Sequence, residues 1–297
     1  LDAEILPSRP RRAVDPEALE ARLRADSHGE IKAVLTVQID TASGVVNDIP
    51  ALRRAIDHAG HDALLMVDTI ASLACMPFEM DAWGVDVAIA GSQKGLMVPP
   101  GLSFVAANDK ARQRHQSAAL ITRYWDWTMR EGPEHYMKYC GTAPEHMLFG
   151  LRESLDMLLE EGLDNATHRH ALLAGATRAA VACWGQGGTM EFNILEDAER
   201  SNSVTTVRIN GADPARLLEF CKDHCGVILG IGIGPELTGK AIRIAHMGHV
   251  NAPMILGTLG VLETALVALD IDHGRGGIEA ATASLGAALA QQNRETA

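Results

Sequence analysis

Positive charge is scarce in this sequence. Its 26 lysines and arginines stand against 38 aspartates and glutamates, which leaves a net charge of −12. A protein that binds nucleic acid usually presents a basic patch to the phosphates, so this balance argues against a nucleic-acid partner. The short basic run at residues 9–12 is more typical of a solvated surface turn than of a binding patch.

Cysteines are also few, and their number is odd. The five are scattered over the chain, at Cys75, Cys140, Cys183, Cys221 and Cys225. This pattern argues against a disulfide framework of the secreted type and favours a reducing, cytoplasmic compartment. Two short groupings, around His224 and around His246, lack further ligands at zinc-like spacing, so we expect no metal site.

Long apolar runs are missing too. No run reaches the length of a membrane-spanning helix, so we expect no membrane partner. The sequence also shows no internal repeat and no low-complexity tract. What it does contain is 47% hydrophobic residues over 297 positions, which is enough for a sizeable core and suits two domains.

The first half of the chain alternates between strand and helix patterns. Buried strands are expected over residues 31–37, 63–67, 85–90 and 102–107. Helices are expected over 15–23, 48–59 and 143–161, the first two with Asp15 and Asp48 as N-caps. Alternating strands and helices predict an α/β fold with a parallel sheet.

After Gly162 the pattern changes. It predicts a helix over residues 165–184, a strand over 204–209, a helix over 214–224, strands near 227–229 and 241–245, and two closing helices. This order is typical of a smaller α+β domain. The sequence therefore predicts two domains, residues 1–162 and 163–297.

Two of the expected strands lead into groups that can do chemistry. Asp68 directly follows the strand at 63–67, and Lys94 follows the strand at 85–90 after three small or polar residues. In an open parallel sheet both groups lie at the carboxyl edge, where ligands bind. An amine that takes up an aldehyde cofactor covalently and a carboxylate that keeps a pyridine nitrogen protonated are what pyridoxal 5'-phosphate (PLP) chemistry requires. The alternatives are a surface lysine and an aspartate that only caps its turn.

The residues around these groups resemble a known family. The segments are Asp68-Thr69-Ile70-Ala71-Ser72-Leu73, Gly91-Ser92-Gln93-Lys94-Gly95-Leu96 and Pro99-Pro100-Gly101. They resemble the class V PLP-dependent aminotransferases, and among these the serine–, alanine– and aspartate–glyoxylate aminotransferases. The resemblance runs from about residue 31 to about residue 277. It implies fold type I, with a mostly parallel sheet and a smaller C-terminal domain, and transfer of an amino group from an amino acid to glyoxylate.

The resemblance also implies roles for single residues around the cofactor. Lys94 would bind the PLP aldehyde, Asp68 would pair with the pyridine nitrogen, and Ile70 would pack on the ring. Gln93 would lie near the phosphate, and Thr41 would contact the phenolic oxygen. Thr41 belongs to the stretch Gln38-Ile39-Asp40-Thr41-Ala42-Ser43-Gly44, in which glutamine stands where the family usually has histidine. A polar turn is the alternative for this stretch.

Three further residues complete the expected site. Tyr139 and Thr142, in Tyr139-Cys140-Gly141-Thr142, would reach the cofactor phosphate of a neighbouring subunit, so the resemblance implies a homodimer with composite sites. Arg243 lies in an apolar strand, where a buried guanidinium needs an anion. Its planar fork suits the α-carboxylate of amino-acid and 2-oxo-acid substrates, and the family's carboxylate-binding arginine falls here. A structural ion pair is the alternative.

The amino donor and the extent of the chain are also expectations. Residues 124–136 resemble the aspartate–glyoxylate branch, which favours aspartate over serine or alanine. A second cation would then contact the side-chain carboxylate, with Arg130, Lys138 and His146 as candidates. The family carries its phosphate-binding turn and ring-stacking residue ahead of this sequence, so we expect an N-terminally truncated chain. Another class V reaction, such as that of a desulfurase or a β-eliminating lyase, and a non-catalytic remnant of the fold are the alternatives.

Overall fold

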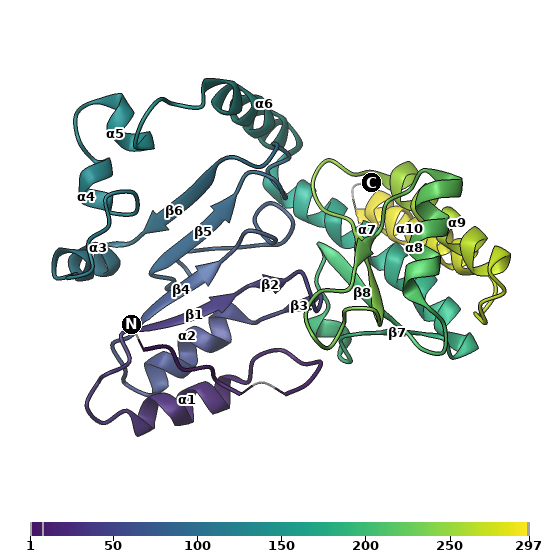
Figure 1. Cartoon of the computed structure of the whole chain (residues 1–297), viewed down its shortest axis with the longest axis horizontal. Coiled ribbons are helices and arrows are strands. Elements are labelled where there is room, and N and C mark those ends of the chain that lie inside the picture. The colour runs from purple at the N-terminus through teal and green to yellow at the C-terminus, as the bar shows by residue number, and fades with distance from the viewer. Residues whose placement is uncertain (1, 8, 296–297) are drawn as a thin grey trace.

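The computed structural model describes residues 2–7 and 9–295 and shows two lobes, each built on its own sheet (Figure 1). The first lobe holds a sheet of strand order β1-β4-β5-β6. Its strands are β1 (Ala33–Val37), β4 (Leu64–Asp68), β5 (Val87–Gly91) and β6 (Ser103–Ala107). β1, β4 and β5 run parallel, whereas β6 pairs antiparallel with β5. The predicted α/β class with a mostly parallel sheet is confirmed.

One face of this sheet is covered by α1 (Pro16–Ala25) and α2 (Ile49–His58). Both helices begin as predicted, because the Asp15 carboxylate accepts a hydrogen bond from the Glu17 amide at 3.1 Å and that of Asp48 accepts one from the Ala51 amide at 2.9 Å. Apolar side chains from the two helices and from β4 form one core. Among its buried members are Leu19, Leu23, Leu52, Ile56, Leu65 and Val67.

The second lobe holds an antiparallel sheet of order β7-β8-β10-β9. Its strands are β7 (Met190–Phe192), β8 (Val204–Ile209), β10 (Ala241–Ala245) and β9 (Gly230–Ile231). The bounds predicted for β8 and β10 are confirmed, whereas the strand expected near 227–229 is present as β9 and begins only at Gly230, after residues 227–229. Those residues instead follow the end of α8 (Pro214–Cys225), where Gly226 is left-handed at φ 70° and the Val227 amide bonds back to the Cys221 carbonyl at 3.0 Å.

Helices pack against this second sheet around a core centred on Trp184. They are α7 (Leu163–Trp184), α8, α9 (Ala252–Ala268) and α10 (Gly277–Glu295). α7 begins directly after α6 (Glu145–Glu161), with Gly162 at φ 86° between them. A small third cluster joins the lobes, since Leu96 of the first lobe packs with Leu158 of α6 and Ala166 of α7.

Several short elements were not expected from the sequence. They are β2 (Ile39–Asp40), β3 (Val45–Val46), α3 (Asp109–Gln116), α4 (Trp127–Arg130), α5 (His135–Tyr139) and the 3-10 turns η1 (Gly185–Gly187) and η2 (Asp197–Glu199). β2 and β3 pair as a hairpin around the stretch 38–44, for which a polar turn was the alternative. Figure 1 shows the segment with α4 and α5 standing clear of the first sheet.

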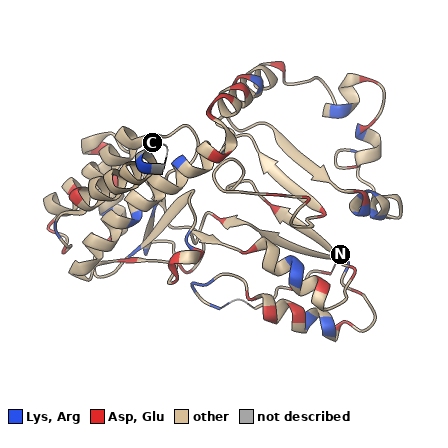
Figure 2. Ribbon diagram, turned by 180° about the vertical axis from the view of Figure 1, so that it is seen from behind, with Lys and Arg blue, Asp and Glu red and all other residues tan. Residues whose placement is uncertain are grey.

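Charged side chains lie mainly on helices and loops. Figure 2 shows acidic and basic residues interspersed along the helices, while the strands of the first sheet carry few of either. Within the described ranges 2–7 and 9–295, no helix combines the length and the apolar character needed to cross a membrane. In the same ranges, no group of three or more His, Cys, Asp or Glu side chains is arranged to hold a metal ion.

Candidate active site

Lys94 lies on the tight turn that follows β5, at the carboxyl edge of the first sheet. The side chain is half-buried, and its amine has no hydrogen-bond or ion-pair partner among the residues that the structure describes. The turn itself is closed by the Met97 amide, which donates to the Lys94 carbonyl at 3.0 Å. The amine is therefore held on a fixed backbone but is free to react.

Two glycines let other segments approach this turn closely. A β-carbon at Gly95 would lie 2.0 Å from the Leu73 carbonyl oxygen, so a larger residue cannot occupy the position unchanged. A β-carbon at Gly248, in the second lobe, would lie 3.2 Å from the Lys94 carbonyl oxygen. The Lys94 turn is thus packed between the segment that follows β4 and the second lobe.

Asp68 ends β4, the strand beside β5, and pairs in register with Ile89. One of its carboxylate oxygens accepts a hydrogen bond from the Ile70 amide at 2.8 Å. The capping of the following turn, which was the alternative reading of Asp68, is therefore present. Its second oxygen has no donor among the described residues, so Asp68 keeps an acceptor for a ligand while it caps the turn.

Arg243 and Thr41 come together across the two lobes. Arg243 stands on β10, and its Nη1 donates to the Thr41 carbonyl at 2.9 Å while its Nε donates to the Ile231 carbonyl at 2.7 Å. Burial lowers the pKa of Arg243, and the nearby Asp40 carboxylate partly offsets that effect. Within the described chain the guanidinium forms no ion pair at salt-bridge distance, so the structural ion pair considered from the sequence is absent there.

The remaining predicted site residues are spread more widely. Ile70 is half-buried beside Asp68, and Gln93 is exposed, with its side chain folded over Gly91. Tyr139 and Thr142 lie at the end of α5 and just beyond it, on the segment that stands clear of the sheet (Figure 1). The structure therefore does not bring these last two to the Lys94 edge of their own chain.

Two of the candidate cations for a second carboxylate, Arg130 and Lys138, lie on that same outlying segment, and His146 lies in the first turn of α6. Arg130 donates to the carbonyls of Tyr124 at 2.8 Å and of Lys138 at 2.9 Å. Its guanidinium also sits 4.7 Å from the centre of the Tyr124 ring. Arg130 thus stabilises its own segment, and Lys138 and His146 are exposed.

Sequence reasoning left Gln38 without a role, yet it adjoins the site. Its amide N–H donates to the Asp68 carbonyl at 2.9 Å, and its side-chain Nε2 donates to the Pro77 carbonyl at 2.9 Å. The residue is only 3% exposed, and its Oε1 has no hydrogen-bond partner within residues 2–7 and 9–295. The departure from histidine at this position was the signal that could have drawn attention to it.

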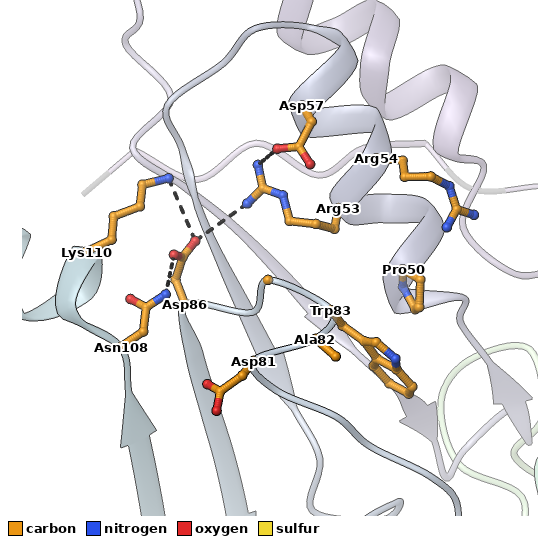
Figure 3. A pocket seen from close by; sticks show the side chains of 11 residues that line it. Pro50, Arg53, Arg54, Asp57, Asp81, Ala82, Trp83, Asp86, Asn108 and Lys110 are labelled. Carbon is orange, nitrogen blue, oxygen red and sulfur yellow. Dashed lines mark hydrogen bonds and ion pairs between the residues drawn. The ribbon is translucent and has the colours of Figure 1, made fainter.

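A separate cleft lies at the opposite edge of the first sheet (Figure 3). Its central carboxylate, Asp86, accepts hydrogen bonds from the Leu65 amide at 2.7 Å and the Asn108 amide group at 2.9 Å. Arg53 lies 3.7 Å and Lys110 3.9 Å from the same carboxylate. These charges pair with one another, and none of the predicted site residues lines this cleft.

The groups at the Lys94 edge fit PLP. An unpaired amine suits the aldehyde, and the open oxygen of Asp68 suits a protonated pyridine nitrogen. A mostly parallel sheet that carries these two groups at its carboxyl edge, with a smaller antiparallel lobe beside it, defines the fold-type I class of PLP-dependent enzymes. The chain belongs to the class-V aminotransferase family, whose model matches residues 1–243.

Known proteins agree with this assignment. The chain is 42% identical to a serine–glyoxylate aminotransferase of Methylorubrum extorquens, over 85% of this chain and 63% of the relative. It is 36% identical to an L-aspartate–glyoxylate aminotransferase of Paracoccus denitrificans, over 87% of this chain and 64% of the relative. A crystal structure of pyridoxamine–pyruvate aminotransferase from Mesorhizobium loti superposes with a TM-score of 0.82 at 31% identity, covering 93% of this chain and 70% of that one. The chain thus spans a little under two thirds of these two curated relatives.

Proposed function

We propose that this protein is a PLP-dependent aminotransferase that moves an amino group from an amino acid to glyoxylate, which yields glycine and a 2-oxo acid. One observation carries the proposal. At one edge of the first sheet, the Lys94 amine and one Asp68 carboxylate oxygen both lack a hydrogen-bond partner among the described residues. Membership of the class-V family and the names of the glyoxylate-dependent relatives support it.

Each residue would make a distinct contribution. Lys94 would hold PLP at its aldehyde, and Asp68 would hold it at the pyridine nitrogen. When bound, PLP supplies an electron sink for the pair left behind at the substrate α-carbon. The Lys94 amine would take the proton from that α-carbon as a general base and would deliver it, as a general acid, to the cofactor carbon that carried the aldehyde.

Arg243 would bind the α-carboxylate that all amino-acid and 2-oxo-acid substrates share. Its Nε and Nη1 each donate to a main-chain carbonyl, which leaves Nη2 for a ligand. The Arg243 guanidinium is partly desolvated and has no ion-pair partner among the described residues. A bound carboxylate would stabilise its charge, because a charge-assisted hydrogen bond would replace the lost hydration.

For the amino donor we propose aspartate first, with serine and alanine as alternatives. The likeness of residues 124–136 to the aspartate branch supports aspartate, while relatives of both names match this chain. Arg130 and Lys138 lie on the α4–α5 segment that stands clear of the first sheet (Figure 1), so a second carboxylate contact from either of them would serve the partner subunit. The test is to measure kcat/KM for aspartate, serine and alanine with glyoxylate as acceptor. Aspartate should give the highest value, and a clearly higher value for serine or alanine would refute this choice of donor.

We further propose a cytoplasmic homodimer with composite sites. Large apolar side chains are exposed on and beside the α4–α6 segment, which is what a partner subunit would cover; they include Leu120, Trp125, Tyr136 and Phe149. In this arrangement Tyr139 and Thr142 would bind the cofactor phosphate of the partner subunit.

The cytoplasmic location is proposed from the cysteines. All five are free thiols, which supports a reducing compartment. The division into domains at residues 1–162 and 163–297 is part of the same proposal.

The experiment that tests the function is reductive labelling. Borohydride treatment of the PLP-loaded protein, followed by peptide mapping, should place the pyridoxyl label on Lys94 and on no other lysine. Lys94→Ala should abolish the label, whereas Lys110→Ala, at a lysine that pairs with Asp62 on the surface, should retain it. A label on any other lysine would refute the assignment, and absence of PLP uptake by the folded protein would refute the proposed function.

A further inference from the structure

The loop at residues 41–44, which we call the cofactor loop, is held by the second lobe through every one of its carbonyl groups. Four consecutive main-chain oxygens each accept a hydrogen bond from a different residue far along the chain. The pairs are Arg243 Nη1 to Thr41 at 2.9 Å, Thr206 Oγ1 to Ala42 at 3.1 Å, Asn193 Nδ2 to Ser43 at 2.9 Å, and the Ser201 amide to Gly44 at 3.0 Å.

The donors belong to one rigid surface. Thr206 and Arg243 are directly paired in the β8–β10 register, and the Asn193 amide N–H donates to the Thr206 carbonyl at 2.9 Å. Arg208 donates to the Asn193 Oδ1 at 3.2 Å, which orients the side-chain amide toward the loop. Thr206 and Asn193 are only 3% and 4% exposed. Packed strands that fix their own donors in this way can also fix the group that accepts from them.

Three of the loop's own amides, those of residues 42–44, are occupied as well. The Asp40 carboxylate accepts from the amides of Ala42 at 3.0 Å and Ser43 at 3.1 Å, and the Asp40 carbonyl accepts from the Gly44 amide at 2.8 Å. Gly44 is left-handed at φ 80°, and a β-carbon there would lie 3.2 Å from the Thr206 hydroxyl oxygen. With donors and acceptors both engaged, the loop backbone is held in a single shape.

The Thr41 hydroxyl is the group that this arrangement leaves open. It has no hydrogen-bond partner among the residues that the structure describes, although the Thr41 carbonyl is bound by Arg243. We propose that Thr206 and Asn193 are positioning residues that aim Thr41 at the cofactor, and that Arg243 does the same in addition to binding substrate. This inference rests on the proposed function, in which Thr41 contacts the phenolic oxygen of PLP.

In this proposal Arg243, which would bind the substrate carboxylate, also fixes the loop that contacts the cofactor. A residue that only bound the α-carboxylate would leave the affinity for PLP unchanged when removed. Because Arg243 also holds the Thr41 carbonyl, Arg243→Gln should raise the dissociation constant for PLP as well as the KM of the amino donor.

The decisive measurement is the PLP dissociation constant, with the absorption spectrum of the bound cofactor followed over pH. Thr206→Val keeps the shape of the side chain and removes the hydroxyl donor, so PLP should bind about fivefold more weakly, as expected for the loss of one hydrogen bond. Thr206→Ser keeps the donor and should restore affinity. Thr177→Val is the matched control, because Thr177 is equally buried in the second lobe and its hydroxyl bonds within α7 to the Leu173 carbonyl at 2.9 Å.

A second measurement needs no cofactor and applies to any variant that folds. Amide hydrogen exchange at residues 42–44 of the apoprotein should speed up in Thr206→Val and stay at the wild-type rate in Thr177→Val. If Thr206→Val does not fold, Asn193→Ser takes its place in both measurements, since it removes the amide donor to the Ser43 carbonyl.

The outcomes separate this inference from the proposed function. Weaker PLP binding in both Thr41→Val and Thr206→Val, with Thr206→Ser and Thr177→Val unaffected, supports the positioning role. Weaker binding in Thr41→Val alone overturns the positioning role and leaves the proposed function standing. If the wild-type protein takes up no PLP at Lys94, the proposed function falls, and the inference falls with it.

Discussion

The Ser92 hydroxyl donates a hydrogen bond to the Pro99 carbonyl at 2.8 Å and accepts one from the Leu102 amide at 3.2 Å. Ser92 is fully buried and comes two residues before Lys94. One side chain thus ties the lysine turn to the Pro99-Pro100-Gly101 stretch. This contact gives a physical reason why the two motifs occur at a fixed spacing.

Ser92→Ala should therefore loosen the lysine turn. It removes the hydrogen bond to the Pro99 carbonyl and the one from the Leu102 amide, and the loss of both should lower the free energy of unfolding by about 1–3 kcal/mol. Urea denaturation measures the effect. Ser103→Ala, at an exposed position of β6, serves as the control and should change stability little. Equal stabilities for the two variants would show that the Ser92 bonds do not hold the turn.

Asp68→Asn should leave the fold intact and slow the reaction. The amide can still accept from the Ile70 amide, but it carries no charge to keep a pyridine nitrogen protonated. We expect PLP to bind while kcat falls more than about tenfold, which corresponds to one pKa unit of lost charge interaction. Steady-state kinetics checks this, and a near wild-type kcat would remove Asp68 from the mechanism.

Gly95→Ala should be strongly destabilising. The added β-carbon would lie 2.0 Å from the Leu73 carbonyl oxygen, and a backbone atom cannot move aside as the end of a side chain can. We expect the free energy of unfolding to fall by about 3 kcal/mol or more, in line with overpacking of a closed interior. Gly257→Ala is the control, because no atom lies within 4 Å of its β-carbon position in α9, and alanine favours helix there.

Stability should fall as the solution becomes acidic, in part because of His246. This side chain is fully buried, and burial lowers its pKa from 6.5 to about 3. Its Nδ1 lies 2.8 Å from the Asn202 carbonyl and its Nε2 lies 2.9 Å from the Thr205 hydroxyl, which is the pattern of a neutral ring. Arg178 and His170 face it and further disfavour its charged form.

The sign of the effect follows from proton uptake. Between pH 6.5 and about 3 the unfolded chain binds a proton at His246 that the folded chain does not, so unfolding becomes easier as the pH falls through this window. Urea titrations at several pH values should show a steeper loss of stability in the wild-type protein than in His246→Gln. Parallel curves for the two proteins would show that His246 does not titrate in this way.

Local patterns in the sequence were enough to predict most of the longer helices and strands. Asp15 and Asp48 were predicted as N-caps from their position before a proline-bearing first turn, and both accept a first-turn amide. β8 and β10, which are rich in β-branched residues, have the predicted bounds, and turn residues such as Gly211 and Gly239 lie just outside them. The strand expected near 227–229 begins only at Gly230, because the Val227 amide bonds back to the Cys221 carbonyl at the end of α8.

The closeness of Asp68 and Lys94 was also predictable from the sequence. Each comes just after an apolar strand, and neighbouring parallel strands place their carboxyl ends at one edge. The chemistry proposed for these two residues was suggested by residue type alone, because an amine and a carboxylate are the groups that PLP chemistry requires. Strand order and the antiparallel direction of β6, by contrast, depend on which edges pair, and no local pattern records that.

The sequence by itself thus determined most of the elements, the placement of Asp68 and Lys94 at one sheet edge, and the family to which the chain belongs. The tertiary structure alone decided how the lobes meet. Arg243 and Thr41 are 202 positions apart, yet they share a hydrogen bond, and Thr206 reaches the Ala42 carbonyl over 164 positions. Helical and strand periodicities describe which face of an element is apolar, but a contact between two lobes depends on how whole sheets dock. The hydrogen bonds from the second lobe to the cofactor loop therefore follow only from the tertiary structure, in which both sheets are in place.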